Sequence, residues 1–210
     1  MIEGLTVGER IVLLALDEES GELREAPLRV ALAASAAVLV ELRLAGELVE
    51  RDGSFVVVGV PAETAGAVVA ERVRSHAGET AREVLLGVRE EVLDAVYREL
   101  SGKGLVREEG RRVLGAFGSV RHPVTGTAEL AALREELADV VVGGQEPGER
   151  TAALVAVLHH AGLRSLLPGG AEAEARVAAI AEGQTTAAAL GDTIRATVAA
   201  LTAVIAASAL

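Results

Sequence analysis

The stretch at residues 28–49, LRVALAASAAVLVELRLAGELV, constrains the fold most strongly. Between residues 30 and 42 only Ser35 and Glu41 are not apolar, so a helix there has almost no polar face. Such a helix must be covered by protein on nearly every side, and Gly46 offers a left-handed residue at which it can end. Residues 47–59, ELVERDGSFVVVG, then have the pattern of a β-hairpin. We expect a central core helix followed by a hairpin.

Two uncharged runs, residues 30–40 and 196–210, raise the question of a membrane-spanning segment. A spanning helix needs about 20 predominantly apolar residues, and both runs are shorter than that. We therefore expect both to be buried helices. The chain has no Cys, and its first ten residues lack the basic-then-apolar pattern of a signal peptide. These features predict a cytoplasmic protein.

The remaining pattern is mainly helical. Thr6 followed by Glu9 has the spacing of a capping box and predicts a short helix within residues 5–17. In residues 88–100 apolar and charged side chains occupy opposite helix faces. Further helical segments are expected at 61–76, 79–86, 127–137 with Thr127 as cap, 150–160, 172–181 and 185–210. Residues 1–210 then form a single globular domain, mainly α, with a hydrophobic helical core surrounded by amphipathic helices, plus short β-hairpins.

A second hairpin is expected at residues 106–117. The order of helix, Gly, Leu-Val strand and Val-rich return strand occurs here as it does at residues 44–59. This repetition reflects either a local duplication or the same way of ending a helix used twice.

A helix followed by a hairpin is also how a winged helix ends, and basic residues of this region could contact phosphates: Lys103, Arg107, Arg111 and Arg112. Glu108 and Glu109 lie among them. The whole chain has 20 basic and 31 acidic residues, a formal net charge of −11. Because this charge repels phosphate backbones, we do not expect nucleic acid as a partner.

No arrangement typical of an enzyme is present in the sequence: there is no Walker loop, no GxGxxG after a strand, no HExxH and no nucleophile elbow. The acidic run at residues 17–22 lacks the alternating spacing of a calcium loop. The adjacent His159 and His160 would point about 100° apart on a helix, and His76 and His122 have no evident partner for acid–base chemistry. We expect a non-enzymatic protein without a metal or cofactor.

Several segments together resemble the Golgi phosphoprotein 3 family, in the form of its bacterial members. In chain order they are LTVGERIVLLALDEESGEL, LVELRLAGELV, LDAVYRELSGKGLVREEGRRVLGAF, RHPVTG and RTAALVAVLHHAGLRSLLP. Each is built largely of Leu, Ala and Gly, so the collinear set over most of the chain carries the resemblance.

The resemblance implies a predominantly helical domain with a protruding hairpin. It also implies a peripheral membrane adaptor, because eukaryotic members bind phosphatidylinositol 4-phosphate at the Golgi membrane and hold glycosyltransferase tails. Their headgroup contacts are an aromatic before the central helix, an Arg within it, and two Arg three residues apart on a later helix. The corresponding positions here are Ala26, Ser35, Glu90 and Leu93. The family's phosphoinositide specificity is therefore not carried over by its contact residues.

We accordingly expect a peripheral membrane or adaptor protein on the inner face of the membrane, with an anionic phospholipid as partner. Candidate headgroup contacts are the arginines near the family's positions or on the second hairpin: Arg29, Arg89, Arg107, Arg111 and Arg112. The alternative is a protein-interaction scaffold without lipid binding, whose protein partner or second copy associates through the 106–117 hairpin.

Overall fold

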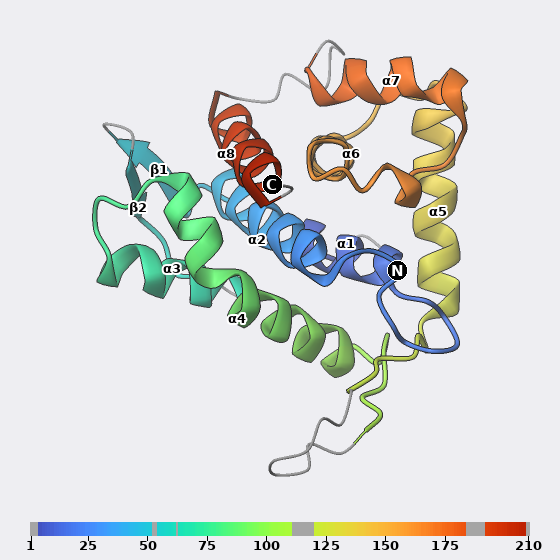
Figure 1. The fold of residues 1–210 in the computed structure, drawn as a ribbon, viewed down its shortest axis with the longest axis horizontal. Coiled ribbons are helices and arrows are strands. Elements are labelled where there is room, and N and C mark those ends of the chain that lie inside the picture. Colours follow the sequence, from blue (N-terminus) through green and yellow to red (C-terminus); the bar gives the residue numbers. More distant parts are fainter. Residues whose placement is uncertain (1–3, 52–53, 62, 111–119, 184–191, 209–210) are drawn as a thin grey trace.

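The computed structural model describes residues 4–51, 54–61, 63–110, 120–183 and 192–208. Its elements, drawn in Figure 1, confirm the expected mainly α fold. They are α1 (Val7–Ala15), α2 (Pro27–Leu44), β1 (Leu48–Arg51), β2 (Ser54–Val57), α3 (Thr64–Ser75), α4 (Ala81–Gly102), α5 (Thr127–Val141), α6 (Glu149–His160), the 3₁₀ turn η2 (Arg164–Leu166), α7 (Ala171–Ala181) and α8 (Asp192–Ser208).

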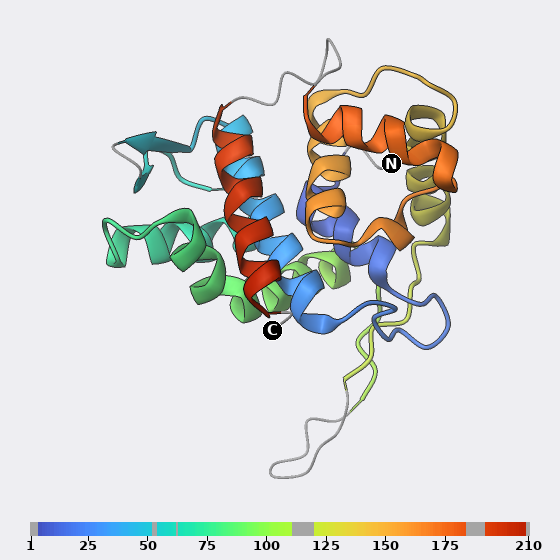
Figure 2. The ribbon, with the colours of Figure 1, turned by 45° about the horizontal axis from the view of Figure 1, so that its top comes forward.

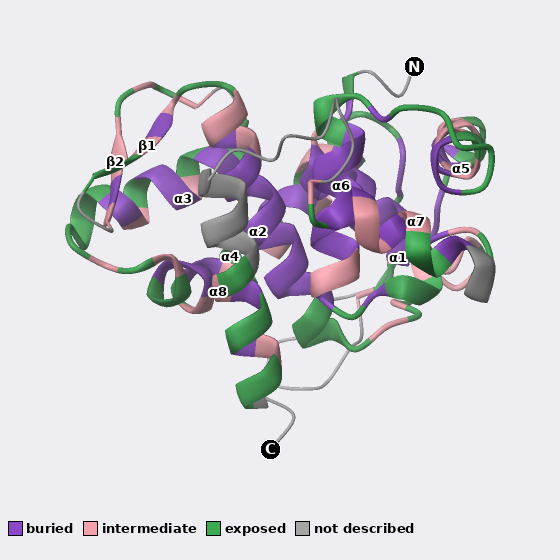
Figure 3. Cartoon of the chain, turned by 90° about the horizontal axis from the view of Figure 1, so that it is seen from above, coloured by how far each residue is buried: buried purple, intermediate pink, exposed green. Residues whose placement is uncertain are grey.

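The central helix expected from the sequence is α2. Every residue from 30 to 40 is buried, and the central parts of α2 and α6 are coloured as buried in Figure 3. At its end Gly46 has φ +71°, the Glu47 N–H donates to the Leu42 carbonyl at 2.8 Å, and the Gly46 N–H donates to Arg43 at 3.0 Å. This pair of bonds is a Schellman motif, which satisfies the last free carbonyls of the helix. The expected hairpin follows, with β1 antiparallel to β2.

The other helices enclose α2 on several sides. Figures 1 and 2 show α3, α4 and the β1–β2 hairpin on one flank, α5, α6 and α7 on the other, and α8 running alongside α2. Direct contacts join α2 to α1, α3, α4, α6 and α8. The apolar surface of α2 is thus covered by these neighbouring helices.

The first helix begins as expected. The Thr6 hydroxyl accepts from the Glu9 N–H at 3.2 Å, and the Glu9 carboxylate accepts from the Thr6 N–H at 2.8 Å, which completes the capping box. Glu9 and Arg10 are nevertheless buried. Arg10 forms an ion pair with Glu136 of α5 at 3.2 Å. The pair joins α1 to the flank that α5 occupies.

Several helix boundaries differ from those expected: α3 begins at Thr64 instead of residue 61, and α5 continues to Val141. The segment at residues 79–86 is not separate, because α4 runs without interruption from Ala81 to Gly102 behind a second capping box of Thr80 and Glu83. Helix α5 is preceded by Gly126 as its N-cap, so the expected cap Thr127 is instead the first helical residue. The pattern Thr-x-x-Glu at residues 80–83 is a helix-start signal that marks the true beginning of α4.

The second hairpin is also larger than expected. Val106 bridges to Val124, and Glu109 bridges to Arg121, so the returning chain is the segment around the RHPV turn. The return strand expected at residues 113–117 lies outside the described residues. Gly104, with φ +70°, ends α4 by the same Schellman pair seen after α2, with the Leu105 N–H donating to Leu100 at 2.9 Å. Both hairpins therefore leave a helix through the same turn.

The sequence predicts no membrane-spanning helix, and the described helices bear on this prediction. None of them combines the length and the apolar content needed to cross a lipid bilayer. The last helix expected from the sequence, 185–210, corresponds to α8, and its residues 185–191 lie outside the described part of the chain.

Candidate functional site

A groove lies where the start of α2, the second half of α4 and the second hairpin meet. Its volume is about 1060 Å³. The acidic loop before α2 is fixed to the hairpin, because the His122 N–H donates to Gly21 at 3.0 Å and the Val124 N–H donates to Glu18 at 3.2 Å. We call this space the α2–α4 groove; its lining residues are Gly21, Glu22, Leu23, Pro27, Leu93, Asp94, Tyr97, Arg98, Ser101, Glu108, Val120 and His122.

The floor of the α2–α4 groove contains a stacked pair of rings. Tyr97 and His122 lie nearly parallel, with ring centroids 3.8 Å apart. Burial, with a smaller effect from Asp94, raises the pKa of the Tyr97 hydroxyl to about 12. Burial also lowers the pKa of His122, although Glu108 and Asp94 oppose this shift. Both rings are therefore uncharged at neutral pH.

This stack supplies the partner that the sequence did not reveal for His122. The partner is the ring of Tyr97, which lies on the apolar stripe of α4 and covers the imidazole. The sequence pattern predicts that Tyr97 is partly buried, because it lies on the apolar stripe of an amphipathic helix, but it does not predict that His122 lies against it.

The charged groups of the α2–α4 groove are mostly carboxylates. Glu22 is paired with Arg121 at 3.0 Å, and the Arg98 Nε donates to the backbone carbonyl of Asp94 at 3.3 Å. Asp94 and Glu108 both face His122 closely enough to affect its pKa. The lining thus combines apolar side chains with three carboxylates and one guanidinium. These carboxylates disfavour an anion inside the groove.

The expected headgroup arginines lie on the elements that border the α2–α4 groove, but none of the described ones lines it. Arg29 is exposed in the first turn of α2, with its guanidinium near the backbone of Gly162. Arg89 of α4 is paired with Glu90 at 3.2 Å. Arg107 on the hairpin stem is paired with Glu109, and its Nε lies 3.0 Å from that carboxylate. Arg111 and Arg112 lie outside the described residues.

The positions that the resemblance assigns to headgroup contact have different surroundings. Ala26 is exposed immediately before α2, and Leu93 lines the α2–α4 groove. Ser35 is fully buried, and its hydroxyl donates to the Ala31 carbonyl at 2.9 Å. A side chain at position 35 therefore points into the protein, where it has no access to a ligand in the groove.

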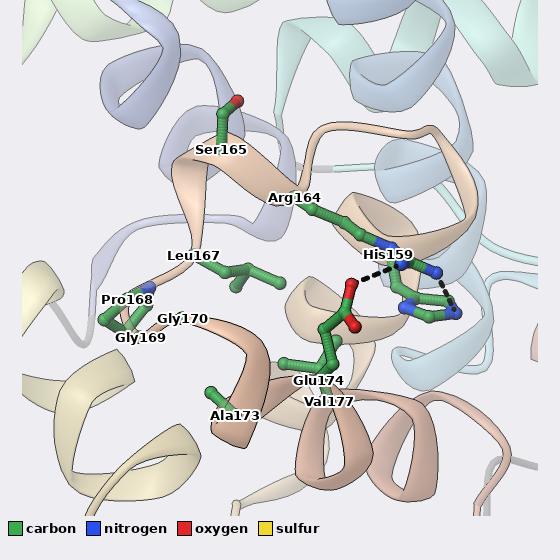
Figure 4. A pocket seen from close by; sticks show the side chains of 10 residues that line it. All are labelled: His159, Arg164, Ser165, Leu167, Pro168, Gly169, Gly170, Ala173, Glu174 and Val177. Atoms are coloured by element: carbon green, nitrogen blue, oxygen red, sulfur yellow. Dashed lines mark hydrogen bonds and ion pairs between the residues drawn. The ribbon is translucent and has the colours of Figure 1, made fainter.

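A second, smaller pocket of about 320 Å³ lies between the end of α6 and the start of α7 (Figure 4). Arg164 donates to Glu174 at 3.1 Å and lies 3.4 Å from the Nε2 of His159. The Nδ1 of His159 is buried without a hydrogen-bond partner among the described residues. Burial first, and then the nearby Arg164, lower the pKa of His159, so this imidazole is neutral at neutral pH.

The two adjacent histidines do not converge on one point. The rings of His159 and His160 meet edge to face at an interplanar angle of 80°, and the Nδ1 of His160 lies 3.4 Å from the Thr202 hydroxyl on α8. Within the described ranges no three His, Asp or Glu side chains are grouped so that they could hold a metal ion.

Comparison with known proteins places this architecture in a family. A scan of protein families matches residues 7–197 to the family described as Golgi phosphoprotein 3 (GPP34). A search of curated proteins found no match. The family match covers every element from α1 to α7 and the first part of α8.

Proposed function

Because the chain belongs to the Golgi phosphoprotein 3 (GPP34) family, we propose that it is a non-enzymatic peripheral membrane adaptor that acts at the inner face of a membrane. The position of the α2–α4 groove is the observation that carries this proposal. Pro27 and Leu93 line it, and they coincide with or adjoin the family's headgroup positions at Ala26 and Leu93. The groove is thus formed by the same elements that the resemblance assigns to lipid contact.

The first turn of α2, which begins at the groove-lining Pro27, has the character of a membrane-contacting surface. Leu28 is 44% exposed at the start of α2, and the neighbouring Arg29 is also exposed. An apolar side chain beside a cation favours binding to an anionic bilayer surface. The carboxylates of Glu22 and Asp94 would repel a phosphate from the interior of the groove, so the headgroup binds outside it, through Arg29. The remaining candidates are Arg89, Arg107, Arg111 and Arg112.

The proposal predicts salt-sensitive binding to anionic vesicles. We expect the protein to float with vesicles that contain phosphoinositide or cardiolipin, and to remain behind with neutral vesicles. Arg29→Ala should weaken the binding about fivefold, since one basic residue near a membrane surface contributes about 1 kcal/mol. Arg82→Ala is the matched control, because Arg82 is exposed but lies about 16 Å along α4 from Leu93. Equal flotation with neutral and anionic vesicles would contradict the proposal.

A protein-interaction scaffold without lipid affinity is the second candidate. The carboxylates of Glu22, Asp94 and Glu108 in the α2–α4 groove favour it, because they suit a polar or cationic protein surface better than a phosphate. Light scattering and a pull-down separate this candidate from the first. A strict monomer that captures no partner and floats with anionic vesicles would remove it.

A further inference from the structure

A buried carboxylate lies at the start of α1. Glu9 is fully buried, and its Oε2 accepts from the Lys103 Nζ at 2.6 Å and from the Thr6 N–H at 2.8 Å. Its Oε1 is also buried but has no hydrogen-bond partner among the described residues. The Oε2 atom therefore has two hydrogen-bond donors, whereas Oε1 is removed from water and has no donor in its place among the described residues.

A second carboxylate in the same region has the same defect. Glu99, one turn before the end of α4, accepts from the Ala65 N–H at 2.8 Å through Oε1. Helix α3 has no side-chain cap of its own, so this bond from α4 takes the place of a cap. The Oε2 of Glu99 is buried without a hydrogen-bond partner in the described part of the chain.

The charges around Glu99 come from four elements, and they do not balance. Glu9 faces it from α1, and Lys103, at the end of α4, is already bonded to Glu9. Glu41 of α2 and Glu63 before α3 line the same small cavity of about 20 Å³ as Glu99. Glu41 takes Arg150 as its own partner at 2.6 Å. Lys103 therefore acts on two carboxylates, its partner Glu9 and the nearby Glu99.

Burial is the largest influence on this group, and the nearby Glu9 adds to it; both raise the pKa of Glu99. The bonds from the backbone N–H groups of Ala65 and Thr64, and the charge of Lys103, oppose the shift. The raising influences prevail, so Glu99 keeps its proton to a higher pH than an exposed carboxyl does.

We propose that the Glu99 carboxyl retains a proton and that this proton operates a latch on α3. With the proton bound, the Glu99 side chain stays beside the start of α3 and accepts the hydrogen bond from the Ala65 N–H. When the proton leaves, repulsion from Glu9 and the penalty of burying a second charge drive the Glu99 side chain toward water. The start of α3 then loses its only capping acceptor from α4. The α3 flank is therefore loosened by alkaline pH.

The direction of the pH effect follows from the raised pKa of Glu99. The folded protein holds this proton more tightly than the unfolded chain, so the stabilising contribution is complete below the unfolded pKa of about 4.3 and is lost as pH rises through the folded pKa. The latch therefore opens as pH rises through the folded pKa of Glu99.

Two measurements on the full chain test the latch. Infrared spectroscopy in D₂O should show a protonated carboxyl band that persists above the pH at which exposed carboxyls have ionised, and Glu99→Gln should remove it. Amide exchange at Ala65, corrected for its intrinsic rate, should show protection that falls about tenfold over the pH range in which the protonated carboxyl band disappears. In Glu99→Gln the protection should not change with pH, because the amide keeps an acceptor oxygen without a charge.

The matched control is Glu90→Gln, since Glu90 lies on the same helix with its side chain 83% exposed. It should keep both the infrared band and the pH response of the parent. The latch would be disproved by the absence of a persistent carboxyl band in the parent, a reading that holds even if Glu99→Gln does not fold. It would also be disproved if Glu99→Gln kept the parent's pH response.

Discussion

Tyr97 affects the electrostatic character of the α2–α4 groove, because its ring and that of His122 are uncharged and line the groove together with the carboxylates. A neutral His122 cannot offer a cation to a phosphate, and the low polarity of the stack strengthens the effect of Asp94 and Glu108 on anything that binds there. These properties support the proposal that a headgroup phosphate binds outside the groove, at Arg29. The charges of individual residues thus make the interior of the groove unfavourable for an anion.

The raised pKa of Tyr97 gives a direct test of this arrangement. The chain has one Tyr and no Trp, so tyrosinate absorbance reports a single group. In the folded protein we expect Tyr97 to titrate with a pKa of about 12, whereas in urea it should titrate near the ordinary value of about 10. The folded state holds the proton more tightly, so stability falls as pH rises from about 10 to 12. Titration of the folded protein near the ordinary value would show that the ring is not buried against His122.

At the scale of elements, the two helix-to-hairpin junctions use one physical solution. Gly46 and Gly104 both have a positive φ, and in each case a Schellman pair closes the helix before the chain turns outward. The hairpins themselves differ, because β1 pairs with β2 over four residues whereas the second is held by isolated bridges at Val106 and Glu109. The shared turn favours a common way of ending a helix over the conservation of a whole duplicated unit.

The end of α4 offers a matched pair of substitutions. Gly104→Ala should lower the free energy of unfolding by about 1 to 2 kcal/mol, because an L side chain is disfavoured at φ +70°. Gly102→Ala should leave it unchanged or raise it by up to about 1 kcal/mol, since residue 102 is helical. A Cβ at either position has open space around it, so steric clash does not enter the comparison. Urea denaturation measures both values, and equal effects would contradict the role of Gly104.

At the scale of the whole molecule, small side chains set how closely the helices around α2 can pack. Val40 of α2 forms a separate buried cluster with Ala153, Ala156 and Ala181, from α6 and α7. With only methyl groups on the α6 side, the α2 and α6 backbones can approach closely, and dispersion contacts replace the bulk that aromatic residues supply in other cores. The scarcity of aromatics in the sequence is thus compensated by close helix packing.

Enlarging a residue in this cluster should therefore be costly. Ala156→Leu adds volume where Ala156 is fully buried, and we expect it to lower the free energy of unfolding by about 1 to 3 kcal/mol. Ala128→Leu on the exposed face of α5 is the control, with an expected change within about 0.5 kcal/mol. Thermal or urea unfolding provides the measurement. A tolerated Ala156→Leu would mean that α2 and α6 can move apart without loss.

Local sequence patterns were sufficient where the governing interactions are short in range. The apolar run of α2, the capping box at Thr6, the glycine that ends α2 and the β1–β2 hairpin depend on residues a few positions apart, and all are confirmed. The uninterrupted α4 also has a local signal, because Thr80 and Glu83 have the spacing of a capping box. These features could be predicted because helix and turn energies depend on near neighbours.

Only the tertiary structure decided which distant side chains meet. It stacked His122 on Tyr97, brought Glu99 to the start of α3 beside Glu9, and buried Ser35 beneath the surrounding helices. It also paired the hairpin stem with residues 121 and 124, farther along the chain than the local pattern indicated. The sequence by itself determined a central helix that must be covered, because burial of apolar surface is not directional. The contacts of the groove and the latch depend on distance and direction between remote residues, which only the folded chain specifies.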